Sequence, residues 1–236
     1  MLRVSNAHVN WYLLADDEGV TVVDAGLPRH WQILPRALDR IGRRLDDVRA
    51  LVLTHGHYDH VGFAERARRE LHVPVYAPRG EDIYRHPLRF PFERLPLLYA
   101  TNPGFLKVAA RFAANGALLT KGVEEVIEFG DGDELPVPGR PRALATPGHT
   151  PGHVALHLPQ HDAVITGDAL VTLDPYTGLT GPRLVAKAAL ADSAKNLATL
   201  SRIAETGAGH LFPGHGEPWH GPAEEAVAIA RRNGTR

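Results

Sequence analysis

A cluster of three histidines and one aspartate within six residues is the feature that most constrains how this chain folds. The apolar run Leu51-Val52-Leu53 leads almost directly into the cluster, which consists of His55, His57, Asp59 and His60. Histidine is the commonest side-chain ligand for transition metals, and carboxylate is the next natural partner. Side chains so close in sequence converge on one point only where a loop curls around something. The cluster therefore predicts a metal-binding loop at the end of a buried strand.

Three later loops offer further side chains of the same kind. They carry His149, Asp168 and His215, each of which follows a strand-like run and is preceded by a glycine. Glycine permits the tight turn that aims the next side chain, and loops that follow strands at one edge of an α/β sheet gather in a common cleft. The combined set of seven groups exceeds what one tetrahedral ion needs and suits two ions that share a bridge.

The order of these motifs resembles the metallo-β-lactamase superfamily of metal-dependent hydrolases. The family pattern of His-x-His-x-Asp-His, a later Gly-His, a Gly-Asp and a final Gly-His occurs here in that order, and the stretch Val22-Val23-Asp24-Ala25-Gly26 also matches. The resemblance covers nearly the whole chain. It implies an α/β fold, a four-layer αββα sandwich of two mixed β-sheets flanked by helices, with the active site at the edge between the sheets.

The same resemblance implies a set of ligands for each of two divalent ions. The first ion would be held by His55, His57 and His149, and the second by Asp59, His60 and His215, with Asp168 as the bridge. Asp24 matches the family's early aspartate and is expected to orient the cluster through hydrogen bonds rather than to bind metal. Zinc is the metal expected first, and manganese and iron stay open because His and Asp suit all three.

Two such ions provide for hydrolysis without a serine or cysteine nucleophile. Ions roughly 3.5–4 Å apart lower the pKa of a bridging water to near neutrality and hold it as a hydroxide that attacks a carbonyl or phosphoryl centre. Asp59 is expected to steer this nucleophile and to take its proton. The chain has no cysteine and no Gly-x-Ser-x-Gly motif. Tyr176, soon after Asp168, is a candidate for substrate contact, whereas Tyr58 is expected to pack away from the ligands and His153 to be a hydrogen-bonded strand residue.

Strand-like and helix-like segments alternate irregularly, which favours a layered sandwich in one domain, residues 1–236. We expect strands at 9–14, 20–23, 50–53, 73–76, 126–129, 142–145, 154–158, 163–166 and 210–212, and helices at 31–41, 63–71, 190–204 and 223–232. Residues 78–122 differ, because they hold four of the seven phenylalanines and several prolines. This stretch is interpreted as a partly helical insertion near the active site, which either packs onto the sandwich or forms a lid over a substrate pocket.

Charge and hydropathy remove several classes of function. The chain has 26 basic and 27 acidic residues, well mixed, so no basic face for nucleic acid is expected. No apolar run reaches the 18 residues of a membrane span, and the start of the chain lacks the apolar core of a signal peptide, so we expect a cytoplasmic protein with no membrane partner. The expected partner is a small-molecule substrate with an apolar part, because the insertion offers apolar surface. A homodimer stays an open alternative.

Several activities of the superfamily remain as alternatives. The expected function is hydrolysis of a small ester, thioester or lactone by a metal-bridging hydroxide. Val171 stands where quorum-signal lactonases often place a tyrosine, and the sequence ends soon after His215, where glutathione thioesterases carry a helical substrate domain. The other two readings are an iron-dependent redox enzyme that acts on sulfur compounds and a non-catalytic ligand-binding protein on the same fold. Proteins of the last kind usually lose ligands, and here none is missing.

Overall fold

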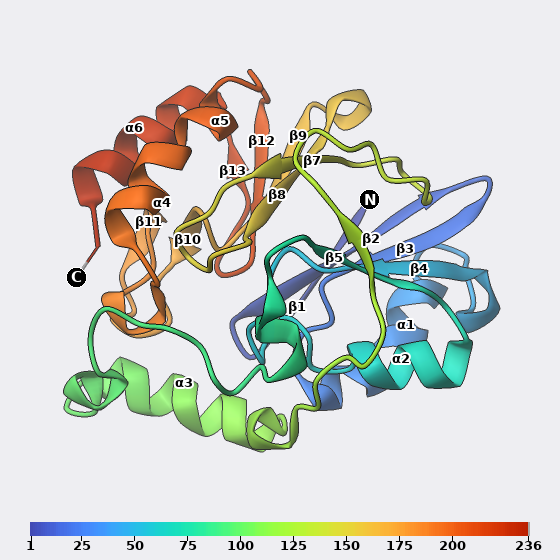
Figure 1. Ribbon diagram of the computed structural model, residues 1–236, viewed down its shortest axis with the longest axis horizontal. Coiled ribbons are helices and arrows are strands. Elements are labelled where there is room, and N and C mark those ends of the chain that lie inside the picture. The colour runs from blue at the N-terminus through green and yellow to red at the C-terminus, as the bar shows by residue number, and fades with distance from the viewer. Residues whose placement is uncertain (236) are drawn as a thin grey trace.

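Two mixed β-sheets pack against each other in the computed structural model, which describes residues 1–235 (Figure 1). The first sheet has six strands in chain order: β1 (Leu2–Asn6), β2 (Val9–Asp16), β3 (Gly19–Val23), β4 (Val48–Val52), β5 (Val75–Pro78) and β6 (Ile127–Phe129). The strands β1 to β3 pair antiparallel through short turns, whereas β3 to β6 run parallel and need longer crossovers. The strands β3 and β4 therefore end at the same edge of this sheet.

The second sheet has the strand order β13-β12-β9-β8-β7. Its members are β7 (Arg142–Ala145), β8 (Val154–Leu158), β9 (Ala163–Gly167), β12 (His210–Pro213) and β13 (Trp219–His220). The strands β9 and β12 pair in parallel, and β7 runs in the same direction because β8 is antiparallel to both β7 and β9. The carboxyl ends of β7, β9 and β12 consequently share one edge. A separate two-stranded sheet consists of β10 (Val171–Leu173) and β11 (Thr180–Arg183).

Helices cover the outer faces of both sheets. The helices α1 (Leu34–Asp39) and α2 (Ala64–Leu71) pack on the first sheet, and α4 (Ser193–Thr199), α5 (Ser201–Ala204) and α6 (Ala223–Asn233) pack on the second. The core between the sheets includes Tyr12, Leu156 and Ile165, which are buried. Successive strand residues point to opposite faces, so Val22 packs toward the helices while Val23 faces the second sheet. These layers confirm the predicted αββα sandwich.

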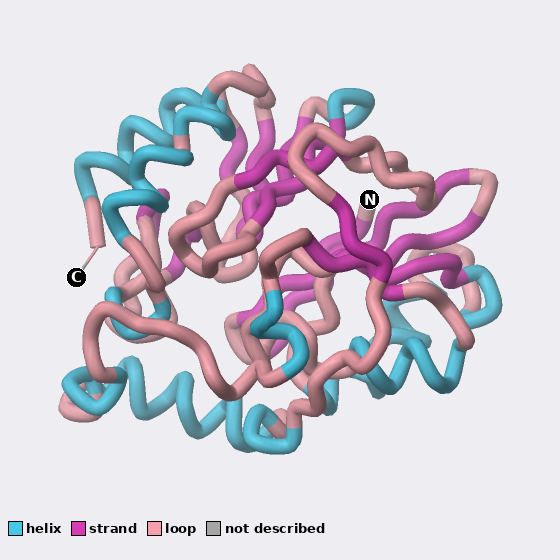
Figure 2. Tube along the Cα trace, in the orientation of Figure 1, coloured by secondary structure: helices cyan, strands magenta, loops and turns pink. Residues whose placement is uncertain are grey.

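The predicted insertion runs between β5 and β6 and is partly helical. It contains the 3₁₀ turns η3 (Asp82–Arg85), η4 (Pro96–Tyr99) and η5 (Ala117–Leu119) and the longer helix α3 (Pro103–Ala114). Pro103 opens α3, and the side chain of Asn102 caps it by accepting a hydrogen bond from the Gly104 amide at 2.8 Å. The remainder of the insertion is loop (Figure 2).

The helix α3 bridges the two halves of the molecule (Figure 1). Its residue Phe112 packs with Val9 and Leu27 of the first half. Near its other end, Phe105 stacks on Tyr176 of the second half, with 5.5 Å between the ring centroids. The helix is therefore anchored by one aromatic side chain on each side.

The structure departs from the predicted elements in a few places. The helix expected over 190–204 is two short helices, α4 and α5, which meet at Leu200. The helix expected over 31–41 begins as the 3₁₀ turn η1 (Pro28–Gln32), because Pro35 lies in the first turn of α1 and supplies no amide hydrogen. The strands β1, β10, β11 and β13 were not expected, since they are short or mixed in polarity. Three more 3₁₀ turns are η2 (Leu45–Asp47), η6 (Pro159–His161) and η7 (Lys187–Ala189). Among residues 1–235, no helix combines the length and the apolar content that a bilayer crossing requires.

Candidate metal centre

Four loops meet at one edge of the sandwich, and each follows a strand. They come after β4 in the first sheet and after β7, β9 and β12 in the second. These loops carry all seven side chains that the sequence proposed as ligands: His55, His57, Asp59, His60, His149, Asp168 and His215. Every one of the seven is at most 6% exposed. The two sheets thus bring groups that are up to 160 positions apart in sequence into one buried cluster.

The first loop curls as its ligand spacing requires. The amides of His60 and Val61 both donate to the carbonyl oxygen of His57, at 2.9 and 3.0 Å, which closes a turn over Tyr58 and Asp59. The carbonyl oxygen of His60 in turn accepts from the amide of Ala25 at 2.6 Å. Backbone bonds therefore fix the loop independently of any ion.

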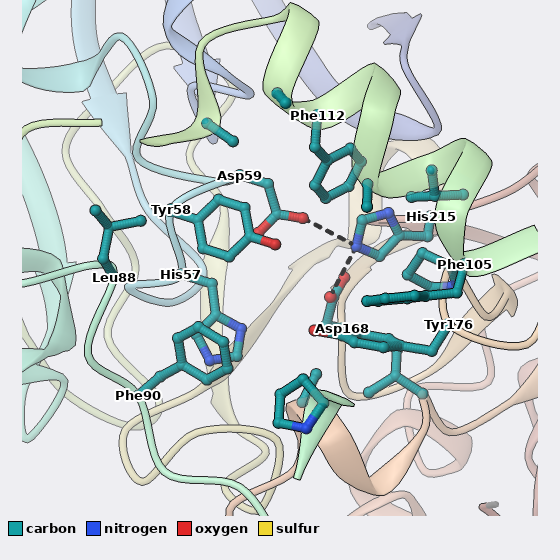
Figure 3. Close-up of a pocket in the computed structure, with 18 of the residues that line it drawn as sticks. His57, Tyr58, Asp59, Leu88, Phe90, Phe105, Phe112, Asp168, Tyr176 and His215 are labelled. Atoms are coloured by element: carbon teal, nitrogen blue, oxygen red, sulfur yellow. Dashed lines mark ion pairs between the residues drawn. The ribbon is translucent and has the colours of Figure 1, made fainter. Parts of the chain in front are cut away.

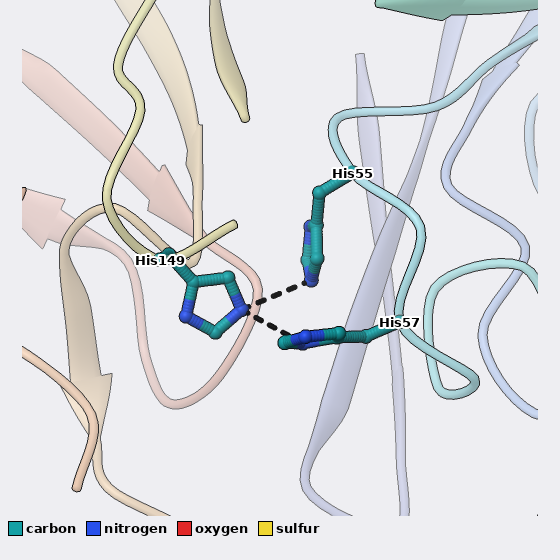
Figure 4. Close-up of side chains that lie close together, drawn as sticks. All are labelled: His55, His57 and His149. Atoms are coloured by element: carbon teal, nitrogen blue, oxygen red, sulfur yellow. Dashed lines mark hydrogen bonds between the residues drawn. The ribbon is translucent and has the colours of Figure 1, made fainter. Parts of the chain in front are cut away.

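Three imidazoles form the first group of candidate ligands. Nε2 of His149 lies 3.2 Å from Nε2 of His55 and 2.9 Å from Nδ1 of His57 (Figure 4). A tetrahedral zinc ion with Zn–N bonds of about 2.0–2.1 Å separates two of its nitrogen ligands by roughly 3.3 Å. Burial lowers the pKa of all three histidines, that of His57 to about 4. The rings are therefore neutral at pH 7, which is the state that binds a metal.

Asp59, His60 and His215 form the second group. Oδ2 of Asp59 lies 3.4 Å from Nε2 of His215 and 3.9 Å from Nε2 of His60. Asp168 lies between the two groups. Its Oδ2 is 3.1 Å from Nε2 of His215 (Figure 3), and it is 3.6 Å from Nε2 of His149. This is the place that the sequence expectation gave to a bridging carboxylate.

Buried carboxylates in and beside the second group favour the protonated form of its two histidines. Burial alone would lower the pKa of His60, but the carboxylates of Asp168, Asp24 and Asp59 raise it to about 9. The pKa of His215 is raised for the same reason, against the effect of burial. Two imidazolium charges thus balance the two carboxylates of the cluster. Divalent cations placed there would supply the same compensation.

Two unpartnered atoms test whether the cluster fits metal ions. Nε2 of His60 and Oδ1 of Asp168 are buried and have no hydrogen-bond partner within the described part of the chain, although they lie 3.6 Å apart. A buried polar atom without a partner is costly, and a cation between these two atoms would satisfy both. Five imidazoles and two carboxylates are a donor set that zinc, manganese and iron all accept. The residues present therefore fit two divalent ions.

Asp24 lies behind both groups of ligands. Its Oδ2 is 2.9 Å from Nδ1 of His60, and its carboxylate accepts hydrogen bonds from the backbone amide and the hydroxyl of Thr54. The Thr54 hydroxyl oxygen is 3.0 Å from Nδ1 of His55. Because the Thr54 hydroxyl donates its hydrogen to Asp24, its oxygen accepts a hydrogen bond from Nδ1 of His55. Nε2 of His55 therefore carries no hydrogen, and its lone pair faces the cluster. One carboxylate thus sets the orientation of a histidine in each group.

The first sheet also positions the last histidine. Nδ1 of His215 donates to the carbonyl oxygen of His8 at 2.7 Å, so its Nε2 faces Asp59 and Asp168. The side chain of Asn10 on β2 donates to the carbonyl oxygen of Pro213 at 2.9 Å. The turn between β1 and β2, which the sequence did not single out, therefore holds the loop after β12.

His153 directly precedes β8 instead of lying on a strand, and its ring forms hydrogen bonds with protein groups, as expected. Its Nε2 accepts a hydrogen bond from the backbone amide of Asp168 at 3.0 Å, and its Nδ1 is 2.9 Å from the hydroxyl of Thr146. Gly167 has a φ of +49°, and a Cβ added to it would lie 2.7 Å from Nε2 of His153. Only glycine suits that position, which explains the Gly-Asp pair in the sequence.

Glu81 is a residue of this region that sequence reasoning missed. It is 1% exposed, and its carboxylate accepts hydrogen bonds from the amides of Gly56 and Gly152 and from the hydroxyl of Thr150. Gly56 lies between two candidate ligands, and Thr150 follows His149. Burial raises the pKa of Glu81 to about 7 despite these donors. An acidic residue in a polar loop looks like a surface residue in the sequence, so no signal pointed to it.

A cavity of about 370 Å³ opens beside the cluster (Figure 3). His57, Asp59, Asp168 and His215 line it on one side, and mostly apolar side chains of the insertion and of the segment after β10 line the rest. Tyr176 lines this cavity, as the sequence proposed for a substrate contact.

Tyr58 corrects one expectation. Its ring packs against Phe90 and Phe112, with 6.0 Å between centroids in each case, which agrees with a packing role. The same ring, however, lines the cavity together with the candidate ligands instead of pointing away from them (Figure 3). The turn at residues 57–61 is the reason, because it rotates this side chain out of the alternation that an extended strand would impose.

Comparisons with known proteins agree with this geometry. A family model described as the metallo-beta-lactamase superfamily matches residues 5–215. The probable metallo-hydrolase YflN of Bacillus subtilis (strain 168) is 29% identical over 180 residues, which are 73% of this chain and 64% of YflN, so the chain spans less than two thirds of that relative. The hydroxyacylglutathione hydrolase GloC of Haemophilus influenzae is 30% identical over 171 residues, which are 72% of this chain and 70% of GloC. The crystal structure of the metallo-beta-lactamase family protein TTHA1429 from Thermus thermophilus superposes with a TM-score of 0.65 at 26% identity, over 94% of this chain and 74% of that one.

Proposed function

Since the chain belongs to the metallo-β-lactamase superfamily of metal-dependent hydrolases, we propose that it binds two divalent ions and hydrolyses a small ester, thioester or lactone that has an apolar part. One observation carries the proposal. Two groups of three candidate ligands lie with Asp168 between them, and four members of this cluster, His57, Asp59, Asp168 and His215, line one side of a cavity whose other walls are mostly apolar. Zinc is the proposed metal, with manganese and iron as alternatives that the same donors accept.

Each part of the cluster has a task in this proposal. His55, His57 and His149 would hold one ion, Asp59, His60 and His215 the other, and Asp168 would bind both. Bound ions would supply a nucleophile derived from water at neutral pH and polarise the carbonyl oxygen of the substrate. Asp59 would orient that nucleophile and take up its proton at a carboxylate oxygen, because its side chain belongs to the second group and also lines the cavity.

The cavity supports a carbonyl substrate with an apolar part. The phenols of Tyr58 and Tyr176 line it, and burial raises the pKa of both above the usual value, so each offers a neutral hydroxyl at pH 7. A neutral hydroxyl beside the metals can donate to a carbonyl oxygen without adding charge to the cavity. The relative GloC is named as a hydrolase of hydroxyacylglutathione, which supports acyl-group hydrolysis as the class of reaction.

The test is a substrate screen on reconstituted protein. Protein loaded with two equivalents of zinc or manganese should hydrolyse an aryl ester, an aryl thioester or a lactone, and chelated protein should not. Asp59→Asn and His149→Ala should abolish the activity, whereas His161→Ala, which changes an exposed histidine far from the cluster, should retain it. Activity that survives both substitutions in the cluster contradicts the proposal.

Metal analysis separates the two other readings. Protein purified without added metal that contains iron and oxidises a thiol compound, yet hydrolyses none of the test substrates, would favour a redox enzyme. Metal-loaded protein with neither activity would favour a ligand-binding role.

A further inference from the structure

Away from the candidate metal cluster, the walls of the cavity carry no positive side chain. Among residues 1–235, the lining includes neither lysine nor arginine, and its titratable side chains other than the two tyrosines belong to the candidate metal cluster. The basic residues that alternate with lining residues in the insertion, Arg89, Lys107 and Arg111, are exposed and lie outside the lining. An anionic group of a ligand would therefore lose its hydration in the part of the cavity away from the cluster and find no cation there.

One wall of the cavity is a face of α3 with small side chains. Phe105 and Phe112 of this helix both line the cavity, and each is held by an aromatic or apolar neighbour on one half of the molecule. Between and beside them, Ala109 and Ala113 line the cavity one helical turn apart. Two alanines at i and i+4 leave a shallow path along the helix, bounded by the two phenylalanine rings.

We propose that the acyl chain of the substrate is uncharged and apolar and lies along the face of α3 formed by Ala109 and Ala113, so that the cavity rejects acyl chains that end in an anionic group. This inference rests on the proposed hydrolase function and narrows it. Its basis is the part of the cavity wall away from the candidate metal cluster, which holds aromatic, aliphatic and phenolic groups but neither lysine nor arginine. Substrates that carry carboxylates on the acyl side are excluded as a class.

A matched pair of substrates tests the inference directly. The pair is 4-nitrophenyl hexanoate and the 4-nitrophenyl monoester of hexanedioic acid, which differ by a terminal carboxylate in place of a methyl group. For zinc-loaded protein at pH 7.5, kcat/KM for the hexanoate should exceed that for the acidic ester by at least about 100-fold, because the carboxylate must be buried without a partner. Equal use of both esters overturns the inference and leaves the hydrolase assignment intact.

Two lysine substitutions on the same helix provide the control. Ala113→Lys places a cation in the lining. It should reduce the ratio of kcat/KM for the hexanoate to kcat/KM for the acidic ester by about tenfold or more, mainly through a lower KM for the acidic ester. Ala110→Lys adds the same charge to α3 at an exposed alanine outside the lining and should leave the preference unchanged. An equal effect of both substitutions would show that the added charge acts at long range. This result would contradict the proposal that the acyl chain lies along Ala109 and Ala113.

A binding measurement separates this inference from the proposed function. If metal-loaded protein hydrolyses no ester, the proposed function fails, but the chemistry of the cavity is still measurable by displacement of the neutral fluorescent probe Nile red. Hexanamide should displace the probe at a concentration at least about tenfold lower than adipamic acid, its counterpart with a terminal carboxylate. Displacement by the acid at equal or lower concentration overturns the inference.

Discussion

The backbone amide of Gly56 donates a hydrogen bond to Oε1 of the buried Glu81 carboxylate at 3.1 Å. The other oxygen of that carboxylate accepts from the amide of Gly152 at 2.9 Å and from the hydroxyl of Thr150. One side chain therefore ties the loop that carries His55 and His57 to the loop that carries His149. The three imidazoles of the first group depend on this link for their mutual spacing.

Glu81→Gln should weaken binding of the first metal ion by about 10–100-fold, the usual effect of losing a group that orients ligands. Glutamine keeps the size of the side chain, but its amide nitrogen cannot accept the bonds that one of the two oxygens receives. Competition against a chromophoric chelator measures the affinity of the protein for each of the two metal ions. Glu134→Gln, at an exposed glutamate paired with Arg140, is the control and should change neither. Unchanged affinity in Glu81→Gln would show that the loops hold their spacing without this carboxylate.

The pKa of Glu81 gives a second prediction for the same variant. Burial raises this pKa from 4.5 to about 7, so the folded state holds a proton that the unfolded state has lost. The resulting stabilisation is fully present below pH 4.5 and is lost as pH rises through 7. The stability of metal-free wild type relative to Glu81→Gln should therefore fall between pH 4.5 and 7, as measured by urea unfolding.

Glu65 offers a control with the opposite sign. Burial alone would raise its pKa, but hydrogen bonds from Arg68 and Arg69 lower it to about 2. Its contribution is present above pH 4.5 and is lost as pH falls through about 2. Wild type should thus gain stability over Glu65→Gln as pH rises from 2 to 4.5. If the stability of wild type relative to Glu81→Gln also rises with pH, as it should relative to Glu65→Gln, the raised pKa of Glu81 is contradicted.

The fold and the members of the cluster could be predicted from the sequence because each has a local signature. Apolar runs mark β2 to β4, β8 and β9, and a short motif with glycine marks each ligand-bearing loop. The split between α4 and α5 has no such signature, since Leu200 continues the apolar stripe and nothing nearby is a helix breaker. Edge strands such as β1 are equally hard to predict, because only one of its five residues is buried.

The supports of the site could be predicted only in part. Asp24 belongs to a motif, whereas Glu81 and the carbonyl group of His8 do not, because their roles arise from contacts between segments far apart in sequence. Backbone acceptors leave no trace in side-chain identity. The position of Tyr58 in the cavity depends on a turn whose hydrogen bonds a residue pattern does not reveal.

Asp24→Asn should weaken the binding of both metal ions, whereas Glu81→Gln should weaken the binding of the first ion. The Asp24 carboxylate contacts Nδ1 of His60 directly and reaches His55 through the hydroxyl of Thr54. An asparagine keeps one acceptor oxygen, so at least one of these histidines loses the partner that fixes its tautomer. We expect a loss of about 10–100-fold at each site in the chelator competition. If the affinity for only one ion falls, Asp24 orients the ligands of a single group.

Removal of metal should lower stability by an amount that depends on metal concentration. An ion that binds only the folded state stabilises it by about 2.7 kcal/mol when present at 100 times its dissociation constant. His149→Ala and His215→Ala remove one member from different groups, so each should reduce the bound metal from two equivalents to one while the other ion remains. Equilibrium dialysis with elemental analysis measures the stoichiometry. A variant that loses both ions would show that the two sites form only together.

Phe112→Ala should destabilise the protein by about 3 kcal/mol, because it removes a large buried ring that anchors α3 against Val9 and Leu27. The same ring lines the cavity, so KM for an apolar ester should rise while the affinity for metal stays unchanged. Leu106→Ala, at a leucine that is 54% exposed on the same helix, should change stability by less than about 0.5 kcal/mol. Urea unfolding of the metal-loaded proteins measures both effects. If Phe112→Ala is as mild as Leu106→Ala, α3 is held in place by contacts other than this ring.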